Sequence, residues 1–292
     1  PTTDIYTLPL HDALPIWRTD VVTARVDPPL RAGARVLDAD GAELPALVEH
    51  DGHSVTWLAR DVPSLGWRAY RLLAADKPGR ATGWEPAPGS VFANDHYRLE
   101  VDAARGGGVA SLIADGRELI AGGRVGNELA LYEEYPSHPT QGEGPWHLLP
   151  RGPVVCSSES RARVQAYRGP LGQRVVVRGR IGTLLRYTQT LTLWRGIARV
   201  DCRTTIEEFT GADQLLRLRW PCPVPGAMPV SEVGDAVVGR GFALLHEGSR
   251  SVDTARHPWT LDNPAYGWFG LSSAARVRVS GTGVRAISVA EV

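Results

Sequence analysis

Apolar and polar residues alternate with a period of two along most of the chain from residue 17 onward. This period places successive side chains on opposite faces of an extended strand, and no ten-residue segment shows the 3.6-residue period of an amphipathic helix. Segments 18–26, 54–60 and 67–73 are rich in β-branched and aromatic residues, and Asp-Gly pairs mark tight turns near them. The pattern predicts a small antiparallel β-sandwich over residues 17–78.

Proline and glycine residues interrupt this pattern next, and they predict a linker over residues 79–90. Long alternating segments then follow one another without helices between them, which indicates antiparallel sheets packed face to face. We expect an all-β fold in which a larger sandwich occupies residues 91–292, with a hairpin around Asp115-Gly116. The predicted strands of this region lie within residues 96–102, 108–120, 173–181, 184–194, 197–209 and 215–221.

Residues 1–16, with the sequence PTTDIYTLPLHDALPI, do not fit the pattern that follows. A common sequencing-adapter DNA string, read in one frame, encodes LHDALPI, and its upstream continuation encodes residues close to the rest of the segment. We interpret this segment as a translated adapter and exclude it from the fold. The adjacent His11 and Asp12 are therefore not candidates for a catalytic pair.

The composition argues against a nucleic-acid-binding or membrane-associated protein. Lysine and arginine together number 32, aspartate and glutamate also number 32, and no long basic run is present, so neither nucleic acid nor a membrane surface is an expected partner. No apolar run reaches the roughly 20 residues of a membrane helix, and the lack of a secretion signal predicts a cytoplasmic protein. Cys156, Cys202 and Cys222 show no CxxC spacing and are expected to be buried thiols in a reducing compartment, with a zinc site as the alternative.

Two segments, at residues 127–152 and 252–273, depart from strand alternation and combine aromatic, carboxylate and imidazole side chains. The first starts as a strand and becomes a long loop rich in proline and glycine. Aromatic rings cover the apolar C–H face of a sugar while polar groups bond its hydroxyls, so both segments are candidate carbohydrate-binding loops. The alternative is that their tryptophans anchor the loops to a core. The candidate substrate-lining residues are Glu143, His138, Trp146 and His147 in the first segment and His257, Asp262 and Asn263 in the second.

Catalytic motifs are absent from these segments. Glu133 and Glu134 are adjacent, so a strand directs them to opposite faces, and they cannot form the carboxylate pair that a glycosidase places about 5 Å or roughly 6.5–9.5 Å apart. His138 and His147 lack metal-ligand spacing. Gly106-Gly107-Gly108 precedes no predicted helix, so a turn or bulge is expected instead of a phosphate-binding loop. The residues alone therefore predict candidate sugar loops and no catalytic or metal-binding residue.

Several segments together resemble the family 38 glycoside hydrolases, the α-mannosidase family, in their actinobacterial form. They include DVPSLGWRAYRL, GNELALYEEYPSHP, GEGPWHLLPRG and QTLTLWRGIARVDCRT, and the similarity extends over residues 17–292. The resemblance implies a parent enzyme whose amino-terminal barrel binds zinc and supplies an aspartate nucleophile and a carboxylic acid. It also implies that residues 17–78 form a small β-sandwich and that residues 91–292 form the first part of a mutarotase-like super-sandwich. No catalytic or zinc-ligand motif of the family matches a position of this chain.

One contribution to the sugar site follows from the resemblance. In family members an aromatic residue of the β-domain reaches toward the sugar bound in the barrel, and the corresponding stretch here is Gly144-Pro145-Trp146-His147. We therefore expect a non-catalytic carboxyl-terminal fragment of an α-mannosidase, with the missing barrel and an α-mannoside as partners and no cofactor of its own. The alternatives are a stand-alone carbohydrate-binding module and a mutarotase-like isomerase that uses His147 with Glu143.

Overall fold

The computed structural model describes residues 17–64, 66–75, 83–134, 150–224, 228–234, 236–239, 265 and 267–272. These residues form antiparallel strands and two short 3-10 helices, η1 (Ala103–Arg105) and η3 (Ser157–Glu159), so the predicted all-β fold class is confirmed. Within the described ranges, no helix has the length and apolar character needed to cross a membrane. Residues 1–16 lie outside these ranges, and their interpretation as a translated adapter stays a prediction.

Two compact units can be distinguished among the described residues. The first contains the chain up to Tyr97 together with residues 165–175 and 191–201, and the second contains the other described residues from Arg98 onward. Within the predicted linker 79–90, Glu85–Ala87 forms strand β7, which pairs antiparallel with β14 (Arg163–Gly169). The domain boundary at this linker stays a prediction.

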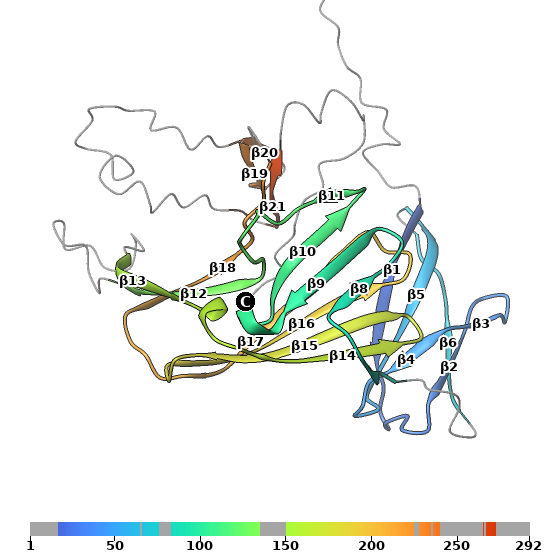
Figure 1. Ribbon diagram of the computed structural model, residues 1–292. Helices are drawn as coiled ribbons and strands as arrows, with labels where there is room; N and C mark the ends of the chain where they lie inside the picture. The colour runs from blue at the N-terminus through green and yellow to red at the C-terminus, as the bar shows by residue number, and fades with distance from the viewer. Residues whose placement is uncertain are drawn as a thin grey trace, which may run out of the picture. The chain divides into compact units, whose positions relative to one another are not determined.

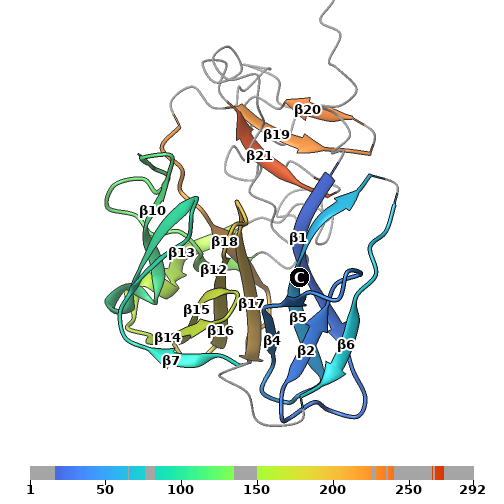
Figure 2. The same cartoon turned by 90° about the vertical axis from the view of Figure 1, so that its right-hand side faces the viewer.

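The first unit begins with two three-stranded antiparallel sheets, in the orders β1-β5-β4 and β3-β2-β6 (Figures 1 and 2). Alternating apolar residues of both sheets turn inward and pack around Val36, Val55 and Trp57, as expected for a small sandwich. The strands are β1 (Trp17–Arg25), β2 (Ala34–Leu37), β3 (Glu43–Leu44), β4 (Ala46–Val48), β5 (Ser54–Pro63) and β6 (Arg71–Ala74).

The strand predicted over residues 67–73 is wrong in its first half, because only Arg71–Ala74 forms β6. Aromatic residues favour strands because they pack against neighbouring strands. Trp67 has no such packing, since 81% of its surface is exposed. The guanidinium of Arg68 donates a hydrogen bond to the carbonyl of Arg60 at 2.9 Å. A side chain therefore bonds the backbone of β5 at this point, and sheet pairing with β2 begins only at Arg71.

A second apolar cluster lies in the same unit and is formed by Leu47, Leu171, Trp194 and Ile197. Arg174 lies beside this cluster and donates hydrogen bonds to the carboxylate of Glu49 at 3.1 and 3.3 Å. Its guanidinium also lies 4.2 Å from the centroid of the Trp84 ring, a distance typical of a cation–π contact. The indole of Trp84 donates to Glu49 at 3.2 Å, so the three side chains hold one another in place.

The other strands form sheets in the orders β11-β10-β9-β8, β13-β12-β18, β17-β16-β15-β14-β7 and β20-β19-β21 (Figure 1). All six predicted strand segments between residues 96 and 221 coincide with observed strands. The strands of these four sheets, apart from β7 and β14 given above, are β8 (Val91–Ala93), β9 (Tyr97–Asp102), β10 (Gly108–Ala114), β11 (Arg117–Glu118), β12 (Glu128–Glu134), β13 (Pro150–Cys156), β15 (Gly172–Ile181), β16 (Leu185–Trp194), β17 (Val200–Phe209), β18 (Gln214–Arg219), β19 (Met228–Glu232), β20 (Val237–Gly239) and β21 (Phe269–Ser272).

The turn predicted at Asp115-Gly116 joins β10 to β11, with Ala114 opposite Arg117 in the register. Both turn residues have positive φ angles, 50° at Asp115 and 72° at Gly116. A two-residue hairpin loop with two positive φ angles matches the twist of the flanking strands. The Asp-Gly signal in the sequence therefore identified both the place and the type of this turn.

Strand β16 shows the alternation of its sequence in three dimensions. Four alternate side chains of the strand, Tyr187, Gln189, Leu191 and Leu193, are almost completely buried. The amide of Gln189 donates to the carbonyl of Asn127 at 2.9 Å, and the hydroxyl of Tyr187 donates to the carbonyl of Gly106 at 3.0 Å. The two polar side chains on this face are therefore hydrogen-bonded, which removes most of the cost of burying them.

Candidate functional site

The predicted sugar-lining residues all lie outside the described residues. Glu143, His138, Trp146 and His147 belong to segment 135–149, and His257, Asp262 and Asn263 belong to segment 240–264. Their role in a carbohydrate site stays a prediction. The strands from which segment 135–149 departs are described, and they define the border of the first predicted loop.

The two ends of segment 135–149 meet at one end of a sheet. In the register of β12 and β13, Glu134 lies opposite Pro150, so the chain leaves β12 and enters β13 at neighbouring positions. Strand β18 pairs with the other edge of β12, and its first residue, Gln214, lies opposite Glu133. Segment 135–149 therefore begins and ends next to neighbouring positions of the sheet β13-β12-β18.

The two faces of β12 differ in chemistry because successive side chains alternate. Leu129 and Leu131 point to one face and are buried at 2% and 3% exposure. The opposite face carries three polar side chains of β12 and, on β18, the two arginines opposite Glu128 and Ala130. We call the following five residues the polar face of β12: Glu128, Tyr132, Glu134, Arg217 and Arg219.

Arg219 connects the side chains of this polar face. Its guanidinium donates to the hydroxyl of Tyr132 and lies 3.4 Å from a carboxylate oxygen of Glu128. The guanidinium carbons of Arg217 and Arg219 lie 5.5 and 5.3 Å from the centroid of the Tyr132 ring, within cation–π range. Glu128 also accepts a hydrogen bond from the hydroxyl of Ser158. Glu128 and Tyr132 are thus engaged with neighbours, and their contacts serve to fix the sheet.

Glu134, at the base of the predicted sugar loop, has a carboxylate neighbour that lies far away in sequence. Its backbone N–H donates to the carbonyl of Asp213 at 2.8 Å. Burial, followed by the negative charge of Asp213, raises the pKa of Glu134 above the ordinary glutamate value, while Arg217 acts in the opposite direction. One carboxyl oxygen of Glu134 is buried and has no hydrogen-bond partner among the described residues. This carboxyl group therefore keeps its proton to a higher pH than an exposed glutamate.

Replacing Glu134 with glutamine is expected to raise the thermal unfolding midpoint near neutral pH. Because the pKa of Glu134 is higher in the folded than in the unfolded chain, its proton stabilises the fold below the ordinary carboxyl pKa. That contribution is lost as the pH rises through the raised pKa, and the ionised group then opposes folding. The gain from Glu134→Gln, measured by scanning calorimetry, should therefore shrink as the pH is lowered from about 7 to about 4.

The matched control for this measurement is Glu133→Gln, which removes the same charge from the exposed neighbouring position of the same strand. The pH-dependent gain of Glu134→Gln should exceed any change of the midpoint in this control. An equal, pH-dependent gain in both variants would show that the net charge of the strand, and not the environment of Glu134, controls the effect.

The cysteines are less buried than expected. Cys156, Cys202 and Cys222 are all half-buried. Burial raises the pKa of the Cys156 thiol and that of the Cys222 thiol, so both groups favour the protonated, weakly nucleophilic form. Within the described part of the chain, no three His, Cys, Asp or Glu side chains come together as metal ligands.

Comparison with known proteins identifies one family. The family model of the glycosyl hydrolases family 38 C-terminal domain matches residues 92–243. The match includes β12, β13 and β18 together with the whole of segment 135–149. A search of the curated proteins finds no match. The polar face of β12 and the predicted first sugar loop therefore both fall inside the matched region.

Proposed function

Because this chain belongs to glycosyl hydrolase family 38 through that family's C-terminal domain, we propose that it is the carboxyl-terminal β-region of an α-mannosidase. In this proposal an amino-terminal barrel outside this sequence hydrolyses the α-mannoside. The present chain braces that barrel and contributes segment 133–147 to the wall of the sugar site. Trp146 would cover the apolar face of the sugar, and His138, Glu143 and His147 would bond its hydroxyls.

The observation that carries the proposal is the family match over residues 92–243. The pairing of Glu134 with Pro150 supports it, because the candidate residues 138–147 then sit on one connection held at both ends. A ligand-lining loop on a fixed support loses less entropy on binding than a free segment does. The arginine and tyrosine contacts of the polar face of β12 supply that support at the root of the loop.

Retaining glycoside hydrolysis requires a nucleophile and a carboxylic acid about 5–5.5 Å apart on either side of the scissile bond. In this proposal both groups belong to the barrel, which also holds the zinc. The contribution of this chain is to orient the sugar and to exclude water from one side of it.

The test is Trp146→Ala in the complete enzyme. We expect kcat/KM for an aryl α-mannoside to fall by about threefold to tenfold, because a stacked aromatic contact contributes about 0.5–1.5 kcal/mol. The unfolding midpoint should stay close to that of the parent. Trp67→Ala is the matched control, since Trp67 is an exposed tryptophan of the small sandwich, and it should leave kcat/KM unchanged.

Two other outcomes would favour the alternatives, in which Trp146 is a core anchor or the chain is a stand-alone carbohydrate-binding module. If Trp146→Ala lowers stability by about 3–5 kcal/mol, as for a buried aromatic, while activity per folded molecule stays normal, Trp146 is a core anchor and the proposed lining role fails. If the isolated chain binds α-mannosides as tightly as the complete enzyme does, a stand-alone carbohydrate-binding module describes it better.

A further inference from the structure

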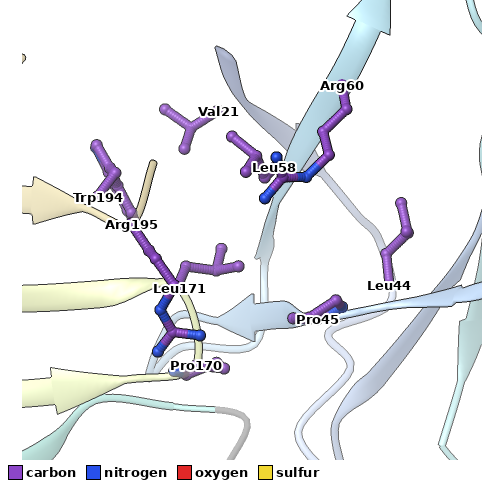
Figure 3. A pocket seen from close by; sticks show the side chains of 9 residues that line it. All are labelled: Val21, Leu44, Pro45, Leu58, Arg60, Pro170, Leu171, Trp194 and Arg195. Atoms are coloured by element: carbon purple, nitrogen blue, oxygen red, sulfur yellow. The ribbon is translucent and has the colours of Figure 1, made fainter. Parts of the chain in front are cut away.

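A small cleft in the first unit combines apolar walls with two arginines (Figure 3). Its volume is about 70 Å³, and a cavity needs only about 10–15 Å³ of such space to hold one water molecule. A carboxylate with a short apolar stem therefore fits. The cleft is lined by Val21, Leu44, Pro45, Leu58, Arg60, Pro170, Leu171, Trp194 and Arg195.

The charge in this cleft is unbalanced. Two of the nine lining residues, Arg60 and Arg195, are cationic, and none is acidic. Within the described part of the chain, neither guanidinium has a hydrogen-bond or ion-pair partner. Asp20 of β1 is bound by Arg199 at 3.0 and 3.1 Å, and Asp95 accepts a hydrogen bond from the backbone N–H of Gly196 at 3.0 Å. The two arginines are therefore free to bind an anionic group that enters the cleft.

The walls of the cleft are fixed before any ligand binds. Trp194 is buried in the apolar cluster with Leu171, its indole N–H donates to Asp201 at 2.5 Å, and its ring centroid lies 5.9 Å from that of Trp84. The backbone N–H of Arg195 donates to the carbonyl of Leu171 at 2.8 Å. A rigid wall lowers the entropic cost of binding, because little has to be ordered when the ligand enters.

We propose that this cleft binds the carboxylate group of a ligand that carries a short apolar body. The planar fork of a guanidinium matches the two oxygens of a carboxylate. The apolar body would lie against Leu58, Leu171 and the ring of Trp194. A phosphate would keep more charge and hydration than these apolar walls compensate. The site lies outside segment 133–147, and its occupancy does not depend on the function proposed for that segment.

The experiment is a ligand-observed NMR titration of the 292-residue chain with butyrate at low ionic strength. We expect butyrate to bind at least about tenfold more tightly than butyramide, which has a similar shape and no charge. Acetate, which lacks most of the apolar body, and inorganic phosphate should both bind more weakly than butyrate. Added salt should weaken butyrate binding, because the attraction is between exposed charges.

Variants connect the binding to the two arginines. Arg60→Gln and Arg195→Gln should each weaken butyrate binding by about fivefold or more, and the double variant should abolish it. Both side chains are exposed and unpaired in the described structure, so the unfolding midpoint should not change. Arg163→Gln, an exposed arginine of β14 outside the cleft, is the matched control and should bind butyrate as the parent does.

The ligand source is distinguished with N-acetyl-glutamate methylamide, which presents the same carboxylate as an acidic side chain of a protein partner. Tighter binding than butyrate assigns the cleft to such a side chain, and weaker binding assigns it to a small free acid. The proposal is overturned if butyramide or phosphate binds as well as butyrate, or if the double variant binds butyrate like the parent.

Discussion

Gly107→Ala is expected to lower the free energy of unfolding by about 2–5 kcal/mol. Gly107 has a φ angle of 68°, a region in which a side chain costs about 1–2 kcal/mol. A Cβ at this position would also lie 2.3 Å from a methyl carbon of Val177, which is completely buried on β15. Overpacking of this kind adds about 1–3 kcal/mol, because a close-packed interior has no space for an extra methyl group. Urea unfolding monitored by circular dichroism measures the loss.

Two further variants separate the backbone cost from the clash. Gly116→Ala meets no atom within 4 Å and has a similar φ angle of 72°, so it should cost only the backbone portion of about 1–2 kcal/mol. In a Val177→Ala background the additional cost of Gly107→Ala should decrease, since the clashing methyl groups are gone. Equal losses for Gly107→Ala and Gly116→Ala would show that the close approach to Val177 does not matter.

Much of the fold could be predicted because strand alternation is a local signal. The period of two in residues 184–194 puts Tyr187 and Gln189 on the same face of a strand, and in β16 that face is buried. The Asp115-Gly116 pair predicted a hairpin turn, and both of its residues have positive φ angles. The glycines at 106–108 were expected to form a turn or bulge, and Gly106 and Gly107 form a turn after η1, while Gly108 begins β10. In each case the side chains that decide the structure are within a few residues of one another.

Predictions were poorer where distant residues decide the structure. Residues 67–70 have strand-forming side chains, yet Arg68 bonds the carbonyl of Arg60 and the paired strand starts later. Residues 85–87 read as part of a Pro/Gly linker, and they pair with β14, whose partner residues follow about eighty positions later. Local propensity cannot report such pairings, because the partner strand supplies the hydrogen bonds.

The candidate site shows the same division. Glu133 and Glu134 are adjacent on β12, where Glu133 is exposed and Glu134 is half-buried. The carboxylate that, after burial, raises the pKa of Glu134 is Asp213, and no local pattern connects these two residues because they are far apart in sequence. The contacts of Arg219 with Tyr132 depend on the pairing of β12 with β18, which a single sequence does not reveal.

The central claim, that this family 38 chain supplies no catalytic machinery of its own, is tested most directly by assaying the purified chain on an aryl α-mannoside, with and without added zinc. We expect a rate indistinguishable from that of buffer, because an enzyme of this kind needs a nucleophile and an acid about 5–5.5 Å apart, and the account places both in another domain. The difference from an active α-mannosidase would then be at least about a million-fold. Zinc-dependent hydrolysis that is abolished by a single substitution within residues 17–292 would contradict the account.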